Sequence, residues 1–442
     1  MALFDFFLAF VLAVAVPAIG QQDFLSIDCG LDPTSSGYTN NELGIFYKPD
    51  GSYVDAGENQ QASAKYVSRT LHPTSYTLRS FPTGGRNCYS LPTNNGAKYL
   101  VRLGFIYGNY DGKNSSSTLQ FDLYLGVNYW DTVYASLDKV YEAVFVAWAS
   151  WAPVCLINTG AGTPFVSTVE LRPLGTELYG NDIVTGSQSM RLHTRQDMGP
   201  TNVYLTQYPQ DPYDRYWWQM NVVPSWANHS TTSTIQTESK FKVPSTVLQK
   251  AITPIGNNTV LSIMTWQDTM ERDYVVFLHF ADFQNSKPRE FDVYFNGNRT
   301  KKAFSPSYLA ASYVYTPGWL KATNENYNIT LAATNVSALP PILNALEIYN
   351  LITHHSTATF FKDFDAIMAI KFEYAVKKNW MGDPCFPKEY AWDGVKCRNT
   401  SGNIARIVSL DLSNSNLRGV ISDNFTLLTA CTREFVSRHM YL

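Results

Sequence analysis

Two glutamates are the first residues to weigh as catalytic groups, because a pair of carboxylates performs the acid and base steps of glycoside hydrolysis. Glu170 lies in PFVSTVELR (residues 164–172), and Glu347 lies at the equivalent place in PILNALEIY (residues 341–349). Each glutamate belongs to a repeated strand pattern, and no second acid accompanies it there. The pattern favours a structural role for both glutamates, with a glycan-acting enzyme as the alternative.

Other catalytic chemistries lack their usual motifs. The sequence contains no GxSxG nucleophile elbow, no glycine-rich nucleotide loop and no HRD segment. The seven histidines are dispersed apart from His354 and His355, and the cysteines form no CxxC pair. His279 stands where the first of two similar segments has Gly104, and we expect it to be a satisfied surface group. We therefore expect no enzymatic activity, no metal and no cofactor.

Two aromatic turns are candidates for ligand binding. Sugars are recognised by aromatic side chains that stack on their apolar faces and by a few polar groups that fix their hydroxyls. The candidates that combine these types are Tyr107, Asn109, Tyr110, Asp111, Tyr129, Trp130 and Asp131. The alternative is that these tyrosines pack one loop against another.

The cysteines are disulfide candidates, because the chain carries features of a secreted protein. They are Cys29, Cys88, Cys155, Cys385, Cys397 and Cys431. Cys385 and Cys397 form the one local pair, and closing so short a loop stabilises by about 3 kcal/mol in the chain-entropy model. The pairing of the other four stays open, including whether Cys431 is bridged or unpaired.

Residues 1–20 are expected to form a secretory signal peptide. An apolar run from Phe6 to Val16 precedes Ala18, Ile19 and Gly20, a small-x-small pattern that suits signal peptidase. An uncleaved signal anchor is the alternative. The net charge is −3 without a basic run, so the sequence lacks the positive surface that nucleic acid requires.

Eight N-x-Ser/Thr sequons also indicate the secretory pathway. Their asparagines are Asn114, Asn228, Asn257, Asn298, Asn328, Asn335, Asn399 and Asn424. We therefore expect a glycoprotein that is extracellular or at the cell surface.

Three strand-like segments occur twice in the same order, which indicates an internal duplication. YLVRLGF (99–105) matches YVVFLHF (274–280), FDLYL (121–125) matches FDVYF (291–295), and the two glutamate segments match each other. Alternation places one apolar set on one face of each copy. Turn sequences such as Asn296-Gly297 separate short strands without a βαβ rhythm. We predict a mainly β fold of two antiparallel sandwiches.

Four segments identify the family that the chain resembles. TLRSFPTGGRNCYSLP, GFIYGNYDG, VCLINTGAGTPFVSTVELRPL and YDRYW closely resemble the malectin-like ectodomain of plant receptor-like kinases. The resemblance implies two tandem malectin-type β-sandwich lobes, at residues 24–190 and 195–351, whose intervening cleft and loops face ligands. We expect Tyr213, Trp217 and Trp218 to pack between the lobes.

The chain changes character after the second lobe. Apolar residues at helical spacing predict a helix over residues 362–378, with Asp363 or Asp365 available to cap its start. The following NWMGDPCFPKEYAWDGVKC and IVSLDLSNSNLRGVI resemble the N-terminal cap and first unit of a plant leucine-rich repeat (LRR). We expect the helix and a disulfide-pinned cap at residues 360–400, one repeat at 404–430, and an aberrant tail at 431–442 that does not continue the repeat.

The resemblance implies a non-catalytic recognition module of an LRR receptor-like protein kinase, without the membrane span and serine/threonine kinase of a full-length parent. The expected ligand is a cell-wall saccharide or a secreted peptide, with a co-receptor protein as a further partner. A full-length parent is expected in the plasma membrane, and this chain would meet a membrane only through the missing span or an uncleaved leader. A secreted soluble decoy is an alternative.

Overall fold

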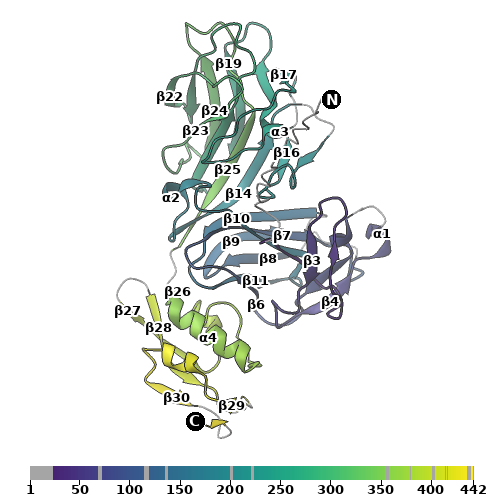
Figure 1. Cartoon of the computed structure of the whole chain (residues 1–442), viewed down its shortest axis with the longest axis vertical. Coiled ribbons are helices and arrows are strands. Elements are labelled where there is room, and N and C mark those ends of the chain that lie inside the picture. The colour runs from purple at the N-terminus through teal and green to yellow at the C-terminus, as the bar shows by residue number, and fades with distance from the viewer. Residues whose placement is uncertain are drawn as a thin grey trace, which may run out of the picture.

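The structure is a computed structural model of the chain, and it is built mainly from β-strands (Figure 1). It describes residues 23–67, 72–113, 119–134, 138–199, 203–220, 223–354, 358–378, 380–400, 404–413, 415, 417–435 and 440–441. The expected signal peptide and the sequon at Asn114 lie outside the described residues. No helix within these ranges is long and apolar enough to cross a membrane.

The first half of the β-structure consists of two sheets around one core. One sheet contains the order β1-β13-β7-β10, and the other contains β6-β11-β8-β9. The bounds are β1 (Leu25–Asp28), β6 (Arg86–Pro92), β7 (Lys98–Ile106), β8 (Gln120–Leu125), β9 (Asn128–Tyr134), β10 (Asp138–Val146), β11 (Trp151–Ala161) and β13 (Thr168–Pro173). Side chains of both sheets, such as Leu103 and Phe121, form one buried cluster.

The second half repeats this arrangement. One set of strands has the order β14-β25-β20-β23, and the facing sheet has the order β19-β24-β21-β22. The bounds are β14 (Gln188–Asp197), β19 (Val260–Gln267), β20 (Tyr274–Phe280), β21 (Phe291–Phe295), β22 (Asn298–Phe304), β23 (Ser312–Tyr315), β24 (Asn326–Ala333) and β25 (Ala345–Thr353). The second half has its own buried cluster, to which Val276 and Phe291 belong.

The three repeated sequence segments lie on strands with matching places in the two halves. They form β7, β8 and β13 in the first half and β20, β21 and β25 in the second. The predicted inward faces are buried, with Phe121, Leu123 and Leu125 in β8 and Phe291, Val293 and Phe295 in β21. Asn296 and Gly297 join β21 to β22 with φ of 49° and 74°, as a type I′ hairpin turn requires.

The two halves are joined edge to edge through their backbones. β10 pairs with β14, and β14 pairs with β25, so one continuous sheet passes through both halves. Most strand pairs are antiparallel as predicted, whereas β1 pairs in parallel with β3 (Phe46–Pro49) and β14 pairs in parallel with β16 (Trp217–Gln219). The halves therefore keep separate cores but share a sheet.

A C-terminal unit follows the second half and lies on the opposite side of the first half from it (Figure 1). It contains β26 (Ala358–Thr359), α4 (Phe361–Glu373), β27 (Val395–Thr400) and β28 (Ile404–Asp411). Trp380 and Trp392 stack with ring centroids 4.9 Å apart in its core. A disulfide joins Cys385 to Cys397, and a second disulfide joins Cys88 in β6 to Cys155 in β11. Cys29 is buried, and neither it nor Cys431 belongs to these two disulfides.

The helix of this unit is shorter than predicted. It ends at Glu373, because Ala375 adopts a left-handed φ of 47° that the helix cannot continue. Asp363 lies in the first turn but does not cap the helix, since its carboxylate accepts hydrogen bonds from Arg406 Nε at 2.8 Å and from Ile407 N at 2.9 Å. Asp363 thus ties α4 to β28.

A short segment of the expected tail pairs with the C-terminal unit. β30 (Arg433–Phe435) pairs in parallel with β28, from Ser409 opposite Arg433 to Asp411 opposite Phe435. Parallel stacking of successive strands is how repeat units lie beside one another. Residues 433–435 therefore extend the sheet of the C-terminal unit beside β28, although their sequence lacks the leucine pattern.

Arg86 of the first half fastens the C-terminal unit. Its guanidinium donates to the carbonyl oxygens of Phe386 at 2.8 Å, Met381 at 2.5 Å and Tyr390 at 2.6 Å. The side chain is buried, and Asp383 O accepts a further bond at 3.2 Å. The fork of a guanidinium can serve several carbonyls at once, which a lysine ammonium on its flexible stem does poorly.

We expect Arg86→Lys to loosen the C-terminal unit by about 2–3 kcal/mol, because buried carbonyls lose their donors. Amide hydrogen exchange in α4 and β27 should become faster, while exchange in β20 and β25 stays unchanged. Arg299→Lys is the matched control, since Arg299 is half exposed and pairs only at the surface with Asp292. Equal protection of α4 in both variants would contradict the role given to Arg86.

Candidate functional site

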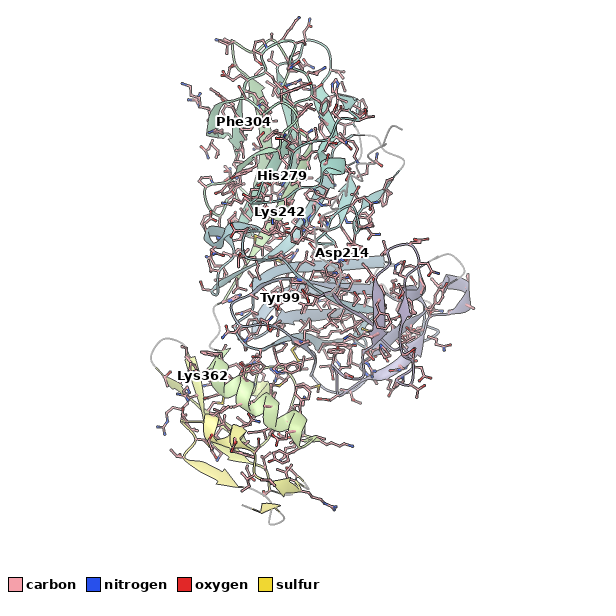
Figure 2. All side chains as sticks on the ribbon, viewed as in Figure 1. Tyr99, Asp214, Lys242, His279, Phe304 and Lys362 are labelled. Carbon is pink, nitrogen blue, oxygen red and sulfur yellow. A yellow bond between two sulfur atoms is a disulfide. The ribbon has the colours of Figure 1, made fainter. Side chains whose placement is uncertain are left out.

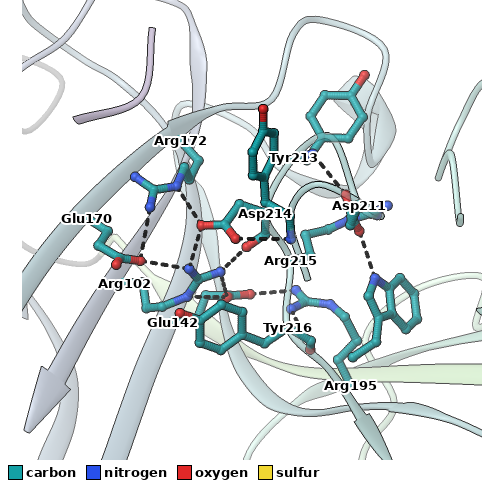
Figure 3. A network of polar contacts seen from close by, with 12 residues as sticks. Arg102, Glu142, Glu170, Arg172, Arg195, Asp211, Tyr213, Asp214, Arg215 and Tyr216 are labelled. Carbon is teal, nitrogen blue, oxygen red and sulfur yellow. Dashed lines mark hydrogen bonds and ion pairs between the residues drawn. The ribbon is translucent and has the colours of Figure 1, made fainter. Parts of the chain in front are cut away.

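The two halves meet at a cluster of buried charged side chains (Figure 3). Glu142 in β10 accepts a hydrogen bond from Arg102 Nη2 in β7 at 3.1 Å and one from Arg195 Nη2 in β14 at 2.5 Å. All three side chains are at most 2% exposed. Glu142 therefore bridges the first half to the second, and we call this cluster the junction network.

The segment YDRYW (213–217) completes the junction network. Asp214 Oδ2 accepts from Arg102 Nη1 at 3.0 Å and from Arg172 Nε at 2.8 Å, and Figure 2 places Asp214 where the halves meet. Trp217, which we expected to pack between the lobes, is fully buried and donates from Nε1 to Asp211 at 2.7 Å. This segment, one of the four that carry the family resemblance, thus supplies charges and packing to the junction.

The two glutamates considered for catalysis lie in the same network. Glu170 accepts from the Tyr47 hydroxyl and from Arg102 Nη1, each at 2.7 Å. Glu347 accepts from Arg195 Nε at 2.8 Å and from the Tyr179 hydroxyl at 2.7 Å. Both carboxylates are buried, and both accept hydrogen bonds from donors within the protein. This supports a structural role for the two glutamates.

Burial alone would raise the pKa of each of these glutamates, but their partners reverse the direction. The Arg172 and Arg102 guanidiniums hold the pKa of Glu170 below its ordinary value. The His279 hydrogen bond and the Arg195 guanidinium hold the pKa of Glu347 well below its ordinary value. Both side chains are therefore ionised at neutral pH.

His279 does not lie at the surface as expected. It is 2% exposed, and its Nε2 lies 3.2 Å from Glu347 Oε1. The signal was present in the sequence, because YVVFLHF is a near-continuous apolar run of the kind that is buried on both faces, and both faces of β20 are buried.

In the first candidate turn, residues 107–111, the tyrosines pack against other side chains of the protein. Tyr107 is buried, its hydroxyl donates to Asp111, and its ring meets Tyr110 at a centroid distance of 5.6 Å. Tyr110 also packs on Phe165, and Asn109 takes a positive φ of 50° at the turn. Here the structure matches the alternative in which the aromatic residues pack within the protein.

The second candidate turn opens onto a hollow of about 370 Å³ at the seam between the halves. Tyr129 is 44% exposed and Trp130 is buried. We call this the seam hollow. Its lining residues are Tyr124, Val127, Asn128, Tyr129, Trp130, Arg191, Arg272, Asn350, Leu351, Ile352 and Thr353. The residues of the first turn do not line it, so the structure does not bring the two candidate groups together.

Asp131 lies beside this hollow and holds one of its arginines. Its Oδ1 is 2.8 Å from Arg191 Nη1, and both side chains are largely buried. Burial raises the pKa of Asp131, and the Arg191 guanidinium opposes that shift. Arg272 is likewise paired, with Asp268 at 3.1 Å.

Four buried polar atoms of the seam hollow have no hydrogen-bond partner among the described residues. They are Trp130 Nε1, Arg191 Nε, Asn350 Nδ2 and Asn350 Oδ1. Asn350 lies beside the Tyr274 hydroxyl, which donates to Asp268 at 3.0 Å and can still accept from the Asn350 amide through its oxygen lone pairs. Buried atoms away from the hollow share this property, such as Ser26 Oγ, Gln196 Oε1 and Trp266 Nε1, so it does not single out the hollow.

The sequence analysis did not find Arg191, Arg272 or Asn350. They come from β14, from the loop before β20 and from β25, and they meet β9 only in the folded chain. No local motif marks them, and only the folded chain brings them together. The described residues contain no group of three His, Cys, Asp or Glu side chains that could hold a metal.

Comparisons with known proteins agree on one family. Residues 27–351 match the family described as Malectin-like domain. In Arabidopsis thaliana, the probable LRR receptor-like serine/threonine-protein kinase At1g05700 is 37% identical over 433 residues, which are 95% of this chain and 49% of that protein. The LRR receptor-like serine/threonine-protein kinase IOS1 is 34% identical over 97% of this chain and 48% of its own length. The chain thus spans about half the length of these relatives.

Solved structures share the fold at low sequence identity. The extracellular domain of ANXUR1 from Arabidopsis thaliana has a TM-score of 0.60 at 16% identity, covering 75% of this chain and 97% of that one. The plant receptor-like kinase FER has a TM-score of 0.60 at 16% identity, covering 75% and 96%. A complex of the plant peptide RALF23 with FER and LLG2 has a TM-score of 0.57 at 16% identity, again covering 75% and 96%.

We expect Glu347→Gln to lower the free energy of unfolding at pH 7 by about 3–5 kcal/mol, because Arg195 loses a buried anionic partner. The pKa of Glu347 is lower in the folded chain than in the unfolded one. Its contribution to stability is therefore present above the unfolded value of about 4.3 and is lost as the pH falls below it.

Urea unfolding at several pH values measures both effects. Wild-type stability should fall with decreasing pH more steeply below about pH 4.3 than that of the variant. Glu177→Gln, at an exposed position, is the control and should behave as wild type. Parallel pH profiles for Glu347→Gln and wild type would contradict the assignment.

Proposed function

Since this chain belongs to the Malectin-like domain family, we propose that it is the extracellular ligand-recognition module of an LRR receptor-like protein kinase. The observation that carries the proposal is the 37% identity to a receptor kinase along 95% of this chain. The match covers about half of that relative, and receptor ectodomains share the fold. In a whole protein, the remaining half would supply the membrane span and the kinase.

Within this proposal, the two halves are tandem malectin-type lobes at residues 24–190 and 195–351. Their matching strand orders and separate cores support the assignment. Residues 1–20 would be the signal peptide, 360–400 the helix and LRR cap, 404–430 a single repeat and 431–442 the tail. The Cys385–Cys397 disulfide and the stacked tryptophans support a pinned cap.

The module would act by binding and without catalysis. A secreted peptide with a co-receptor is one ligand class, and the complex of FER with RALF23 and LLG2 supports it by analogy of fold. A cell-wall saccharide is the other class, and the aromatic seam hollow supports it. A chain released without a kinase could act only as a soluble decoy.

Binding by the purified full chain tests the proposal. We expect saturable binding to at least one member of a panel of cell-wall oligosaccharides and secreted plant peptides, measured by biolayer interferometry. The same oligosaccharides should remain intact after prolonged incubation, measured by mass spectrometry. Cleavage of an oligosaccharide would favour a glycan-acting enzyme, and failure to bind either class would contradict the recognition function.

Secretion predicts N-glycans at the surface. Of the sequon asparagines that the structure describes, five are exposed, namely Asn228, Asn257, Asn298, Asn335 and Asn399, while Asn328 and Asn424 are half-buried. A chain secreted from plant cells should lose mass on treatment with a peptide N-glycosidase, and Asn257→Gln should remove one glycan. Asn258→Gln changes the neighbouring asparagine outside the acceptor position and serves as the control. An unmodified secreted chain would contradict this expectation.

A further inference from the structure

The second half has a free strand edge at β23. β23 pairs with β20 on one side, and no strand of the described residues pairs with its other side. Figure 1 shows β23 and β22 along the outer side of this half. We propose that the free edge of β23 binds an extended, acidic peptide, which adds a strand to the sheet. This inference rests on the proposed recognition function and gives it a site for a peptide ligand.

The same edge of the first half is already occupied by a strand. β10 follows the β8–β9 hairpin and pairs with β7, just as β23 follows the β21–β22 hairpin and pairs with β20. On its other side, β10 pairs with β14 in antiparallel orientation. The described residues supply no strand to the corresponding side of β23. The first half therefore shows, within this chain, that an edge of this kind takes up a strand.

The hydrogen bonds of β23 show which of its backbone groups face outward. Residues of an antiparallel pair alternate between hydrogen-bonded and non-hydrogen-bonded positions. Thr316 N donates to Val276 O at 3.2 Å, so Val314, two residues earlier, is also bonded to β20. Tyr313 and Tyr315 occupy the alternate positions, and their N–H and C=O groups therefore point away from β20. A row of free backbone groups is what strand addition requires.

A hollow of about 480 Å³ passes around this edge. Tyr313 and Tyr315 line it together with Ile183, and all three pack in a cluster separate from the core of the second half. Thr300 and Lys301 also line it, and they belong to β22 of the facing sheet. Because the lining comes from both sides of the sheet, the hollow has room for the alternating side chains of an added strand.

The neighbouring edge strand, β22, is protected against pairing, whereas β23 is not. β22 exposes Arg299, Lys301 and Lys302, and its register with β21 is irregular where Ala303 takes a positive φ of 50°. Charged side chains and bulges are common means of blocking a sheet edge. β23 has the sequence SYVY and a regular register with β20, so it carries neither device.

The charges beside the edge favour an acidic peptide. Lys301 lines the hollow, and it belongs to no ion pair among the described residues. Asp182, the carboxylate of the hollow, is already paired with Lys240 at 3.1 Å. An acidic side chain on the added strand would therefore meet an uncompensated positive charge, which gives the site a preference among peptides.

The same charges disfavour a second copy of this chain as the occupant. Two copies paired through β23 would be related by a two-fold axis perpendicular to the sheet. This axis keeps both facing sheets on one side, so Lys301 and Lys302 of β22 would face the same side chains of the second copy. Like charges placed opposite one another oppose association.

Proline substitutions test which groups face outward. Proline lacks an N–H, so Tyr313→Pro removes an outward donor, whereas Val314→Pro removes a bond to β20. Tyr313→Pro should unfold at about the same temperature as Tyr313→Ala, which loses the same ring. Val314→Pro should unfold well below Val314→Ala. If Tyr313→Pro and Val314→Pro lost equal stability relative to their alanine variants, the outward assignment and the proposal would be overturned.

Binding is measured with the purified full chain and a displayed library of random twelve-residue peptides. The enriched peptides should carry acidic residues at every second position, as one face of a strand requires. Their affinity should fall about tenfold or more from Tyr313→Ala to Tyr313→Pro. Lys301→Glu should remove the acidic preference, and Lys302→Glu, whose side chain does not line the hollow, is the matched control. Amide hydrogen exchange in residues 312–316 should slow when a selected peptide is bound.

The outcomes separate this inference from the recognition function. Peptides that bind Tyr313→Pro and Tyr313→Ala equally, or that leave exchange in residues 312–316 unchanged, would overturn strand addition while leaving a recognition module. A library without enriched peptides would overturn the inference, whereas binding of a cell-wall oligosaccharide would still support recognition. A dimer in sedimentation velocity that Tyr313→Pro converts to a monomer would identify a second copy as the occupant and would also overturn the inference.

Discussion

Glu142 receives hydrogen bonds from Arg102 of the first half and Arg195 of the second, and all three side chains are buried. A buried charge is tolerated only when opposite charges and hydrogen bonds surround it, and losing a partner is expensive. Because the two arginines come from different halves, a shift between the halves would separate charges that water cannot reach. The relative position of the halves is therefore fixed by the need to keep this carboxylate paired.

The backbone enforces the same position at the same place. β10 and β14 are outer strands of the two four-stranded sets, and an unpaired outer strand exposes a row of N–H and C=O groups. Ala143 pairs with Arg191 and Val144 with Met190, directly after Glu142 in β10. The strand pairing and the shared carboxylate thus support each other, and sheet edges that would otherwise be exposed become an internal seam.

The sequence predicts those features that depend on local periodicity. The alternation in β8 and β21 predicts their buried faces, and the order of repeated segments predicts the correspondence between halves. The junction network is different, because Tyr47 and Glu170 meet across 123 residues of chain and carry no local pattern. Of the candidate binding residues, Tyr129 and Trp130 do line a hollow, whereas Arg191, Arg272 and Asn350 join them there from distant parts of the chain that no local pattern connects.

The buried carboxylates at the junction are all satisfied within the protein. In the junction network, Glu142, Glu170 and Glu347 all have protein donors, as expected where the role is to hold two halves together. Because these charges stay paired only while the two halves keep their relative position, the junction network holds the surfaces on either side of the seam in a fixed geometry.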